Sequence, residues 1–536
     1  MPSKKLSARY PTDLDAWKSL KSHCKKDLKN KTISSLFKTD SSRADNYNIE
    51  AGNLYLDYSK NIFNSKTIKI FNQLIKQARL VESIQEMFAG YCINTSEDRP
   101  VLHAALRSKL SDQVALDVDG VSDIWATLEK MDHFVSKLHD GKVSGCTGKK
   151  IKNIINIGIG GSELGTSMAV HALQDYWVGD LSYHSVSNGD GVELQNLLSR
   201  LDLEETLFIV CSKTFTTIET SDNAQKARKI TEDQFGKRSI KNHFVGISSN
   251  KEAMQEFGIQ AEYQFNISDW VGGRFSVTSA MGLSLACVVG MKNFYKFLEG
   301  ARRMDLHFRH NKLEENMPMM LAMMAVLNAN FFGFNTQAIL TYNTRLKHFS
   351  AYTQQLHMES LGKNVRFDGT KTKADTGAVI WGGSGSNAQH SYYQLLHQGT
   401  QCIPIDFILP VSDSSNQNDN YNYANCLAQS EALMDGSKDS QYNQVFEGNK
   451  PNNIILLDRL TPDSLGEIVS LYEHKVFVQS VLYGVNAFDQ FGVELGKDIS
   501  NSLEKALARS PSYKGKNQST RRLLSIIKAF GKSKSI

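Results

Sequence analysis

Short, continuous runs of apolar residues alternate along the chain with longer segments of helical periodicity. The clearest run spans Ile154 to Ile157. It is followed by a turn from Gly158 to Gly161 and by a segment from Ser162 onward that the pattern predicts as a capped helix. A second run, Thr206 to Cys211, precedes a helix that is expected to begin near Thr217. Apolar runs of this length between turn signals predict buried strands.

The same alternation recurs in two groups along the chain. In the first group, two more strands are expected at 183–186 and 243–247. A helical stretch from about 279 to 331 separates this group from the second, whose strands are expected at 337–342, 378–381, 403–409 and 454–457. Strands that alternate with helices at these spacings indicate parallel sheets covered on both faces. The predicted fold class is therefore α/β, with two such units.

We expect five parts along the chain. They are an N-terminal helical arm at 1–48, a helical part of the large domain at 49–119, a smaller α/β domain at 120–288, a larger α/β domain at 289–510 and a basic C-terminal extension at 511–536. The polar segment 411–422 is rich in residues that break regular structure, so we expect an exposed loop there.

Composition excludes several classes of protein. With 41% hydrophobic residues among 536, the chain is too apolar for disorder. Its strongly apolar stretches, such as Met319 to Val326, are shorter than the roughly 20 residues that span a bilayer. The first residues lack the apolar core of a signal peptide, and the seven cysteines contain no C-x-x-C pair. We therefore expect a cytoplasmic protein without a membrane segment.

The positive charge is concentrated at the C-terminus. The chain has 61 basic and 56 acidic residues, a net charge of +5. Eight of the basic residues and none of the acidic ones follow position 508, so the rest of the chain is slightly acidic. A basic tail is one way to bind nucleic acid, but this tail lacks interleaved aromatic residues. We expect a solvated terminal helix and no nucleic-acid partner.

Two turns between a strand and a helix are candidate anion sites. The glycine turn, Gly158 to Ser162, places backbone N–H groups at a helix start, where the helix dipole favours an anion. The hydroxyl loop, Ser212 to Thr217, adds four hydroxyls and one ammonium. Tight packing explains the glycines equally well, and helix capping alone uses serine and threonine. If the two strands are neighbours, both turns meet at one ligand, and a small phosphomonoester fits better than a nucleotide.

Two further segments carry the groups of a proton-transfer site. The arginine turn, Val271 to Ser276, has two glycines before Arg274, whose guanidinium stays cationic at any working pH. Gln355 and Glu359 are four residues apart, so they share one face of a helix that Gly362 ends. Glu359 is a candidate general base. A surface arginine and a solvated helix face remain the alternatives.

The last two candidate segments contain a histidine and a lysine. His390 follows a glycine-rich loop and is expected to open a helix, where the dipole favours neutral imidazole. His397 lies two turns further along that helix, and we expect it to be packed. Gln490 and Lys497 are seven residues apart, so a helix would place them on the same face.

Taken in order, these segments resemble the glucose-6-phosphate isomerase family, also called the phosphoglucose isomerase family. The resemblance rests on seven segments: RPVLHAALR (99–107), GIGGSELG (158–165), SKTFTTIET (212–220), DWVGGRFS (269–276), QQLHMESLGK (354–363), NAQHSYYQLLHQGT (387–400) and FDQFGVELGK (488–497). It implies two α-β-α sandwich domains of the sugar-isomerase (SIS) type with parallel sheets, helical extensions at both ends and an intertwined homodimer. It also implies the reversible interconversion of glucose 6-phosphate and fructose 6-phosphate, in glycolysis and gluconeogenesis, without a metal or organic cofactor.

The resemblance also implies roles for individual residues. Glu359 is similar to the base that moves a proton between carbons 2 and 1 through a cis-enediolate, and Arg274 to the cation that stabilises it. His390, which reaches the partner's active site in the family, and Lys497 resemble the pair that opens the sugar ring. The residues implied in substrate binding are Gly161, Ser162, Ser212, Lys213 (chiefly by its backbone), Thr214, Thr217, Glu219, Gly273, Gln355 and Gln490.

The chain departs from the family pattern at several positions, and two rival functions remain as alternatives. Leu361 stands where the family usually has asparagine, Phe491 where it has tryptophan, and Ile218 where it has glutamine; the histidine loop also lacks an acid and a proline. None of these changes removes a proposed catalytic group. One rival is an isomerase that also accepts mannose 6-phosphate, because selectivity at carbon 2 depends on pocket geometry. The other is a non-catalytic sugar-phosphate sensor, which has no use for Arg274 and Glu359 together.

Overall fold

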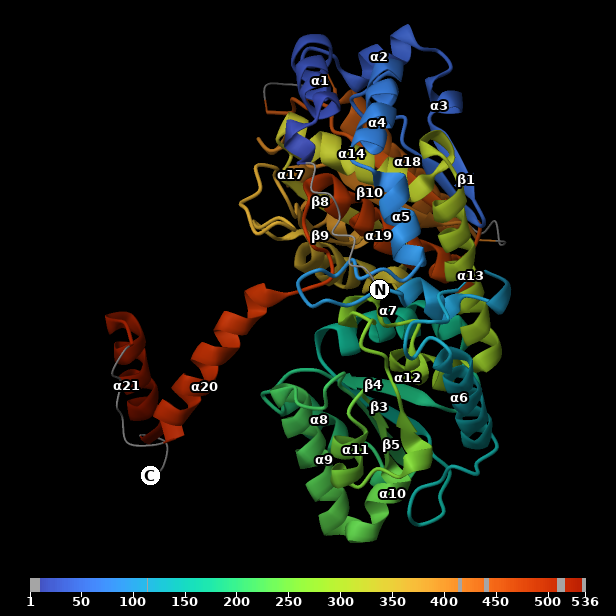
Figure 1. The fold of residues 1–536 in the computed structure, drawn as a ribbon, viewed down its shortest axis with the longest axis vertical. Helices are drawn as coiled ribbons and strands as arrows, with labels where there is room; N and C mark the ends of the chain where they lie inside the picture. The colour runs from blue at the N-terminus through green and yellow to red at the C-terminus, as the bar shows by residue number, and fades with distance from the viewer. Residues whose placement is uncertain (1–9, 113, 413–416, 438–442, 509–515, 533–536) are drawn as a thin grey trace. The chain divides into compact units, whose positions relative to one another are not determined.

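The structure is a computed structural model that describes residues 10–112, 114–412, 417–437, 443–508 and 516–532. Contacts divide the chain into two compact units, Met1–Phe488 and Asp489–Ile536. Among the described residues, every helix is too short or too polar to span a bilayer. The first unit contains both β-sheets (Figure 1).

The smaller sheet has five parallel strands in the order β4-β3-β5-β6-β7. The strands are β3 (Asn153–Ile157), β4 (Ser182–Val186), β5 (Thr206–Cys211), β6 (Phe244–Ile247) and β7 (Gln264–Phe265). The pattern predicted the first four of these strands and the structure confirms them. Strand β7 was not predicted, because two residues are too few to form a recognisable apolar run.

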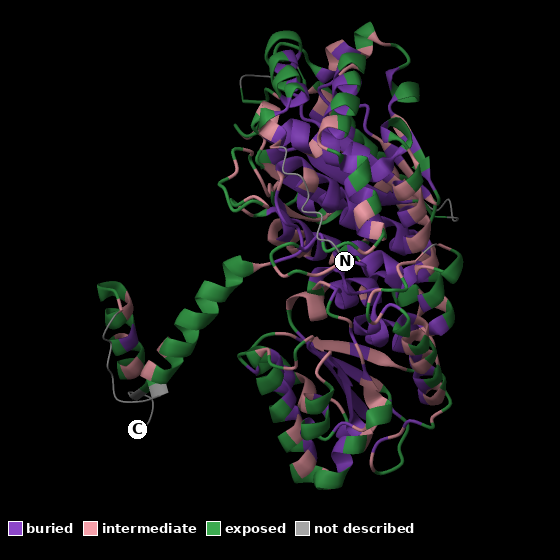
Figure 2. Ribbon diagram, in the orientation of Figure 1, coloured by how far each residue is buried: buried purple, intermediate pink, exposed green. Residues whose placement is uncertain are grey.

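Helices cover both faces of this sheet, which is why its central strand β5 (TLFIVC) is almost wholly apolar, whereas the edge strand β4 (SYHSV) is mixed. On β5, Leu207 and Ile209 belong to one buried cluster, whereas Phe208 and Val210 belong to a second. The helices around the sheet are α6 (Asp123–His139), α7 (Leu164–Ala172), α8 (Val192–Leu198), α9 (Ile218–Phe235), α10 (Ile240–His243), α11 (Lys251–Phe257) and α12 (Leu283–Val289). Figure 2 shows the central strands β3 and β5 mostly as buried and the edge strand β4 mostly as intermediate.

The larger sheet has six strands in the order β1-β2-β11-β10-β8-β9, and its last four strands are parallel. They are β1 (Asn48–Ala51), β2 (Leu54–Asp57), β8 (Thr336–Thr341), β9 (Val379–Ser384), β10 (Ile405–Pro410) and β11 (Asn452–Leu457). The hairpin β1–β2 runs antiparallel and pairs with β11. We had expected segment 49–119 to be helical, but it begins with this hairpin. Its two four-residue strands are joined by a tight turn at Gly52, where φ is +59°.

The expected loop at 411–422 is also corrected in part. Residues 413–416 lie outside the described residues, but α18 (Gln417–Asp435) already includes the second half of the segment. The Asn422 side chain donates a hydrogen bond of 2.7 Å to the carbonyl oxygen of Tyr342. This tertiary contact anchors a helix start that polar composition alone does not predict.

The remaining helices of the first unit pack around the larger sheet or lie in the N-terminal arm. They are α1 (Asp15–His23), α2 (Ile33–Thr39), α3 (Arg43–Asn46), α4 (Ser65–Gln77), α5 (Leu80–Phe88), α13 (Met291–His310), α14 (Met317–Phe332), α15 (Phe349–Gln354), α16 (Gly385–Gln389), α17 (Tyr393–Gln398) and α19 (Pro462–Tyr483). Residues 1–9 of the expected arm lie outside the described residues. The parallel strands fall in the two expected α/β ranges, whereas the hairpin β1–β2 of the larger sheet lies at 48–57, outside the expected 289–510. The five domain limits stay predictions.

Helices α13 and α19 pack so closely that glycine is needed at their contact. A Cβ atom on Gly300 would lie 1.9 Å from the carbonyl oxygen of Asp463, and one on Gly466 would lie 2.0 Å from that of Phe297. The contact brings charged side chains from both helices into the core. These charges are paired, as buried charges must be.

The buried charges form one hydrogen-bonded network. Arg107 donates two hydrogen bonds of 2.7 Å to Asp305 on α13 and a third of 2.7 Å to Glu473 on α19. Burial raises the pKa of Glu473 to about 7, although Arg107 opposes the shift. His474 shares a 2.7 Å hydrogen bond with Asp305.

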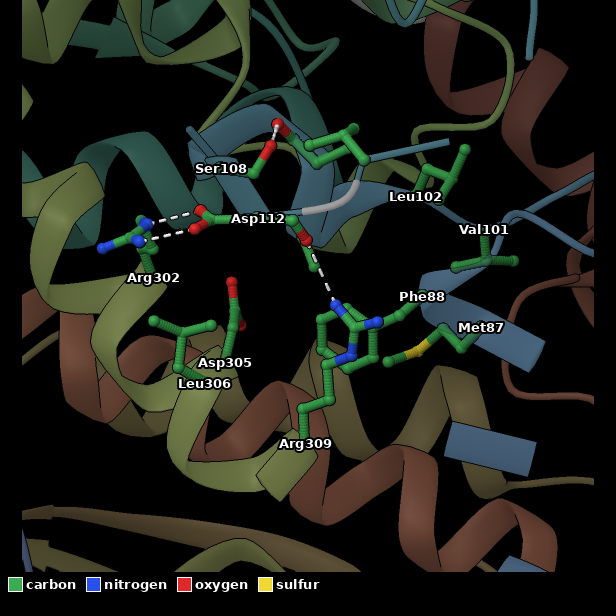
Figure 3. Close-up of a pocket in the computed structure, with 13 residues that line it drawn as sticks. Met87, Phe88, Val101, Leu102, Ser108, Asp112, Arg302, Asp305, Leu306 and Arg309 are labelled. Atoms are coloured by element: carbon green, nitrogen blue, oxygen red, sulfur yellow. Dashed lines mark hydrogen bonds and ion pairs between the residues drawn. The ribbon is translucent and has the colours of Figure 1, made fainter. Parts of the chain in front are cut away.

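A small cavity lies beside this network (Figure 3). Its walls are mostly apolar, and Arg302 closes one side through two hydrogen bonds to Asp112, of 2.5 and 2.6 Å. The cavity volume of about 30 Å³ is room for one water molecule. It is too small for a ligand of the size of a phosphomonoester, so the candidate anion turns have to be located elsewhere.

The second unit consists of a short 3-10 turn, Phe491–Val493, and two helices, α20 (Glu494–Ala508) and α21 (Gln518–Lys532). The helix expected in the basic tail is thus present in α21. Residues 511–515 and 533–536 of the expected C-terminal extension lie outside the described residues.

Candidate active site

The glycine turn and the hydroxyl loop follow neighbouring strands, which is the condition under which both turns can meet at one ligand. Strands β3 and β5 pair in parallel, and in the order β4-β3-β5-β6-β7 the direction of winding reverses between them. Open α/β sheets bind their ligands at this point, beyond the carboxyl ends of the strands. A Cβ atom on Gly158 would lie 3.2 Å from the carbonyl oxygen of Cys211, so the two turns are close neighbours.

The hydroxyls of the hydroxyl loop are not used for helix capping. Thr217 is the N-cap residue of α9, yet its side chain makes no capping hydrogen bond. Instead, Ser212 shares a 3.3 Å hydrogen bond with Thr217, and Thr214 a 2.7 Å one with Thr216. Phe215 has a φ of +59°, a costly conformation for a bulky residue. The loop therefore gathers hydroxyls where capping does not require them, which favours a ligand.

Ser162 does not begin a helix, contrary to our expectation. It ends a 3-10 turn, Gly160–Ser162, and α7 begins at Leu164 without a side-chain cap. The reason is Glu163, whose φ of −134° is not helical and which separates the turn from α7. Ser162 is half-buried and lies in the same turn as Gly161.

The arginine turn lies directly against the glycine turn. A Cβ atom on Gly161 would be 2.2 Å from the carbonyl carbon of Gly273, so the two backbones touch. Ser276 donates a hydrogen bond of 3.1 Å to the carbonyl oxygen of Gly161. The Lys213 ammonium donates to the carbonyl oxygens of Asp269 and Val271. Three turns that are distant in the sequence therefore meet.

Arg274 is buried and held by several groups. Its Nε donates a 2.6 Å hydrogen bond to the Ser360 hydroxyl, and its Nη2 donates to the carbonyl oxygen of Ala487. Its Nη1 lies 3.5 Å from Oε2 of Glu359. The residue is 4% exposed. A fixed, desolvated cation beside a carboxylate is the arrangement that stabilises an anionic intermediate.

Gln355 and Glu359 lie on one face, as their spacing predicted, but on a π-helical turn rather than an α-helix. The turn Gln355–Glu359 continues α15. Both residues are partly exposed, whereas the intervening Leu356 and His357 are buried. A Cβ atom on Gly160 would lie 3.0 Å from Nε2 of Gln355, so this turn reaches the glycine turn. Single π-helical turns are frequent at functional sites.

His390 lies at the end of a helix, not at the start of one. Strand β9 extends to Ser384, and the short helix α16 ends just before His390. The first part of the predicted loop, 382–384, is strand because Gly382 allows a close approach: a Cβ atom there would lie 1.9 Å from the Ile339 carbonyl oxygen. The rest, 385–389, is α16. The His390 side chain is exposed and makes no hydrogen bond or ion pair with any residue that the structure describes.

The expectations for His397 and Glu219 have different outcomes. His397 lies on the separate helix α17 and shares a 2.8 Å hydrogen bond with Gln429, so it is packed as predicted. Glu219 is exposed in the first turn of α9, close to Gly189. Within the described part of this chain, no hydrogen bond joins Glu219 to His390.

Gln490 and Lys497 belong to the second unit. Gln490 precedes the 3-10 turn Phe491–Val493, so it is not on the helix of Lys497, and the predicted shared helical face is wrong. The Lys497 ammonium lies 3.0 Å from Oε1 of Glu494, and both side chains are exposed.

Two contacts of Arg274 were missed by sequence reasoning. The contact with Ser360 could have been predicted from the sequence, because Ser360 directly follows Glu359 in the motif. The contact with the carbonyl oxygen of Ala487 could not, because every residue has a backbone carbonyl group. Across the described ranges, no group of three His, Cys, Asp or Glu residues is arranged to hold a metal ion.

Comparison with known proteins agrees with this geometry. A family model described as phosphoglucose isomerase matches residues 57–524. The glucose-6-phosphate isomerase of Marinomonas sp. (strain MWYL1) is 41% identical over 550 residues, covering 98% of this chain and 100% of that protein. The glucose-6-phosphate isomerase of Pseudomonas aeruginosa (strain LESB58) is 42% identical over 536 residues, covering 96% and 97%.

A solved structure gives the same result. The crystal structure of a glucose-6-phosphate isomerase from Chlamydia trachomatis D/UW-3/Cx has a TM-score of 0.87 at 29% identity, covering 97% of this chain and 100% of that one. Because the family model spans most of the sequence and its relatives align almost end to end, this chain belongs to the phosphoglucose isomerase family.

Proposed function

We propose that this protein interconverts glucose 6-phosphate and fructose 6-phosphate by ring opening and proton transfer through a cis-enediolate. The observation that carries the proposal is the Arg274–Glu359 pair, 3.5 Å apart at the meeting point of the glycine turn and the arginine turn. Relatives that align along nearly the whole chain are named glucose-6-phosphate isomerase.

The phosphate group is assigned to the two turns at the strand ends. The hydroxyls of Ser212, Thr214 and Thr217, with the backbone around Gly161 and Ser162, supply donors for a dianion. Phosphate contacts are remote from the reacting carbons, so their binding energy serves to position the sugar. The hydroxyl loop suits this role because its hydroxyls are not engaged in capping α9.

The proton transfer is assigned to Glu359 and Arg274. The carboxylate takes the proton from carbon 2, and the electrons move onto the carbonyl oxygen at carbon 1 to give the enediolate. The proton on the carbon 2 oxygen passes to the carbon 1 oxygen, and the same carboxylate, now protonated, returns its proton to carbon 1. Carbon 2 thereby becomes the ketone and carbon 1 carries the hydroxyl. Arg274 places a fixed positive charge beside the developing negative oxygens, an effect typically worth about a hundredfold or more in rate.

Ring opening and subunit sharing complete the proposal. His390 and Lys497 supply the groups that move protons between the ring oxygen and the hydroxyl at carbon 1, with Glu219 orienting the histidine. Gln355 and Gln490 hold sugar hydroxyls. We assign His390 to the active site of the partner in a homodimer, which fits its exposed side chain. We further propose a cytoplasmic location and no metal or organic cofactor.

A relaxed isomerase that also accepts mannose 6-phosphate is the second candidate. Glucose 6-phosphate and mannose 6-phosphate differ only in the configuration at carbon 2, so the same residues of this site can bind both sugars. A sensor without catalysis is less favoured, since it has no reason to desolvate Arg274 beside a carboxylate. The deciding experiment is a coupled assay that converts fructose 6-phosphate to glucose 6-phosphate in the presence of EDTA. We expect full activity with the chelator; absence of turnover would refute the proposal, and mannose 6-phosphate as an additional substrate would favour the relaxed enzyme.

A further inference from the structure

Lys213 is anchored at both ends, although it sits in a loop assigned to phosphate binding. Its ammonium donates hydrogen bonds of 2.7 Å to the carbonyl oxygen of Asp269 and 3.1 Å to that of Val271. Its own carbonyl oxygen accepts from the Ser248 hydroxyl at 2.9 Å and from the Ser249 hydroxyl at 2.8 Å. The residue therefore fixes the hydroxyl loop to a segment more than 50 residues away.

The segment that Lys213 holds leads directly to the catalytic arginine. Val271 is the first residue of the arginine turn, and Arg274 follows three residues later. On its other side, the turn is fixed by the Gly161–Gly273 contact and by the hydrogen bond from Ser276 to Gly161. The arginine turn is therefore clamped between the two turns that we assign to the phosphate.

The ammonium is committed to backbone oxygens. A lysine has three donors, and two of those of Lys213 go to main-chain carbonyls. Burial lowers the pKa of this lysine, so part of its hydration is already lost. Hydrogen bonds from a cation are roughly twice as strong as neutral ones, which makes this pair a firm connection between the loop and the turn.

We propose that the Lys213 side chain is a positioning residue that ties the phosphate-binding loop to the placement of Arg274. The inference rests on the proposed isomerase function. It explains how a phosphate held by the hydroxyl loop aids chemistry at carbon 2. When the loop is ordered by the phosphate, the hydrogen bonds of Lys213 also hold the arginine turn in place. A displacement of about 1 Å in a catalytic group lowers rates by up to a hundredfold.

The test compares turnover with phosphate affinity in Lys213→Met, which keeps the apolar stem and removes the donors. We expect kcat for fructose 6-phosphate to fall at least tenfold, while the Kd for inorganic phosphate changes less than threefold. Lys152→Met is the matched control, because the exposed Lys152 ammonium lies 2.9 Å from the carboxylate of Glu205 at the surface of the same sheet. Its kcat should be unchanged.

A double-mutant cycle tests whether Lys213 acts through Arg274. In an Arg274→Lys background, which keeps a cation, Lys213→Met should lower kcat less than threefold, because the group it positions is already displaced. If the fold-losses in kcat of the two single variants multiply in the double variant, the proposal is overturned. Weaker phosphate binding with kcat intact would also overturn it, because Lys213 would then be a simple phosphate ligand.

Two further controls distinguish a wrong positioning role from misfolding of the variants and from failure of the proposed function. Thermal melting of each variant detects lost stability, and Lys213→Arg, which retains a cation with several donors, should recover most of the turnover of a folded Lys213→Met enzyme. No recovery by Lys213→Arg in a protein with normal melting would count against the positioning role. A wild-type protein without isomerase turnover would refute the function itself, before any variant is compared.

Discussion

The backbones of Gly161 and Gly273 touch, although 112 positions separate the two residues. A Cβ atom on Gly161 would lie 2.2 Å from the carbonyl carbon of Gly273 and 2.6 Å from its Cα. This contact joins the turn after β3 to the turn that carries Arg274. The placement of the arginine therefore depends on the absence of a side chain at a residue assigned to phosphate binding.

Gly161→Ala should displace the arginine turn. Its methyl group meets backbone, which cannot rotate away, so we expect kcat/KM to fall about a hundredfold. Steady-state kinetics with fructose 6-phosphate measures this loss. The control is Gly531→Ala in α21, where a Cβ meets nothing within 4 Å; equal activity in the two variants would contradict the close contact.

Ser360→Ala should lower turnover more than binding. The Ser360 hydroxyl accepts a 2.6 Å hydrogen bond from Nε of Arg274, and hydrogen bonds to charged groups contribute about 1.5 to 3 kcal/mol. We expect kcat to fall roughly tenfold or more, with KM within about threefold. A rise in KM alone would show that Ser360 does not hold the arginine for catalysis. Ser199→Ala, at an exposed position, serves as the control.

Acid should destabilise the fold partly through His357. Burial, with the Lys475 cation nearby, lowers the pKa of His357 to about 3. Between about pH 6.5 and pH 3 the unfolded chain therefore binds a proton that the folded protein does not, so stability falls as pH falls. We expect the Tm of His357→Leu to decline less between pH 7.5 and pH 5 than that of the wild type.

Thermal melting at several pH values measures this slope. The exposed His310→Leu change supplies the comparison, because it removes a histidine without altering the core. Parallel Tm curves for wild type and His357→Leu would mean that this histidine does not contribute to acid sensitivity.

Mixing two inactive variants tests whether His390 serves the partner subunit. In a mixed dimer of Glu359→Gln and His390→Ala chains, sharing places both changes in one site and leaves the other site intact. We therefore expect unfolding and refolding the variants together to recover about a quarter of wild-type activity at a 1:1 ratio, since half the dimers are mixed. Activity that stays at the level of the separate variants would assign His390 to the site of its own chain.

The sequence predicted well those features that short segments determine alone. The apolar run from Thr206 to Cys211 is buried between two layers of helices, and its place in a parallel sheet followed from the α/β pattern. The spacing of Gln355 and Glu359 placed both on one face. Each of these features depends on neighbouring residues, which is why a pattern reveals it.

Features that depend on tertiary contacts were missed or misplaced. The hydrogen bond between Arg274 and Ser360 spans 86 positions, and the network around Arg107 spans almost 370. We predicted His390 at the start of a helix because the glycines before it indicate a loop. Instead, close packing of Gly382 against Ile339 extends the strand into this segment. Of the substituted motif positions, Leu361 is fully buried, and Phe491 is exposed within its unit.

The most direct test of the account is the exchange of hydrogen at carbon 2. In D2O, the wild-type protein should replace the hydrogen on carbon 2 of glucose 6-phosphate with deuterium, observed by NMR. Glu359→Gln, whose amide cannot accept the proton, should lower both exchange and isomerisation at least a hundredfold while it binds inorganic phosphate normally. Glu129→Gln, at an exposed position on α6, is the control. Exchange at the wild-type rate in Glu359→Gln would show that another group moves the proton.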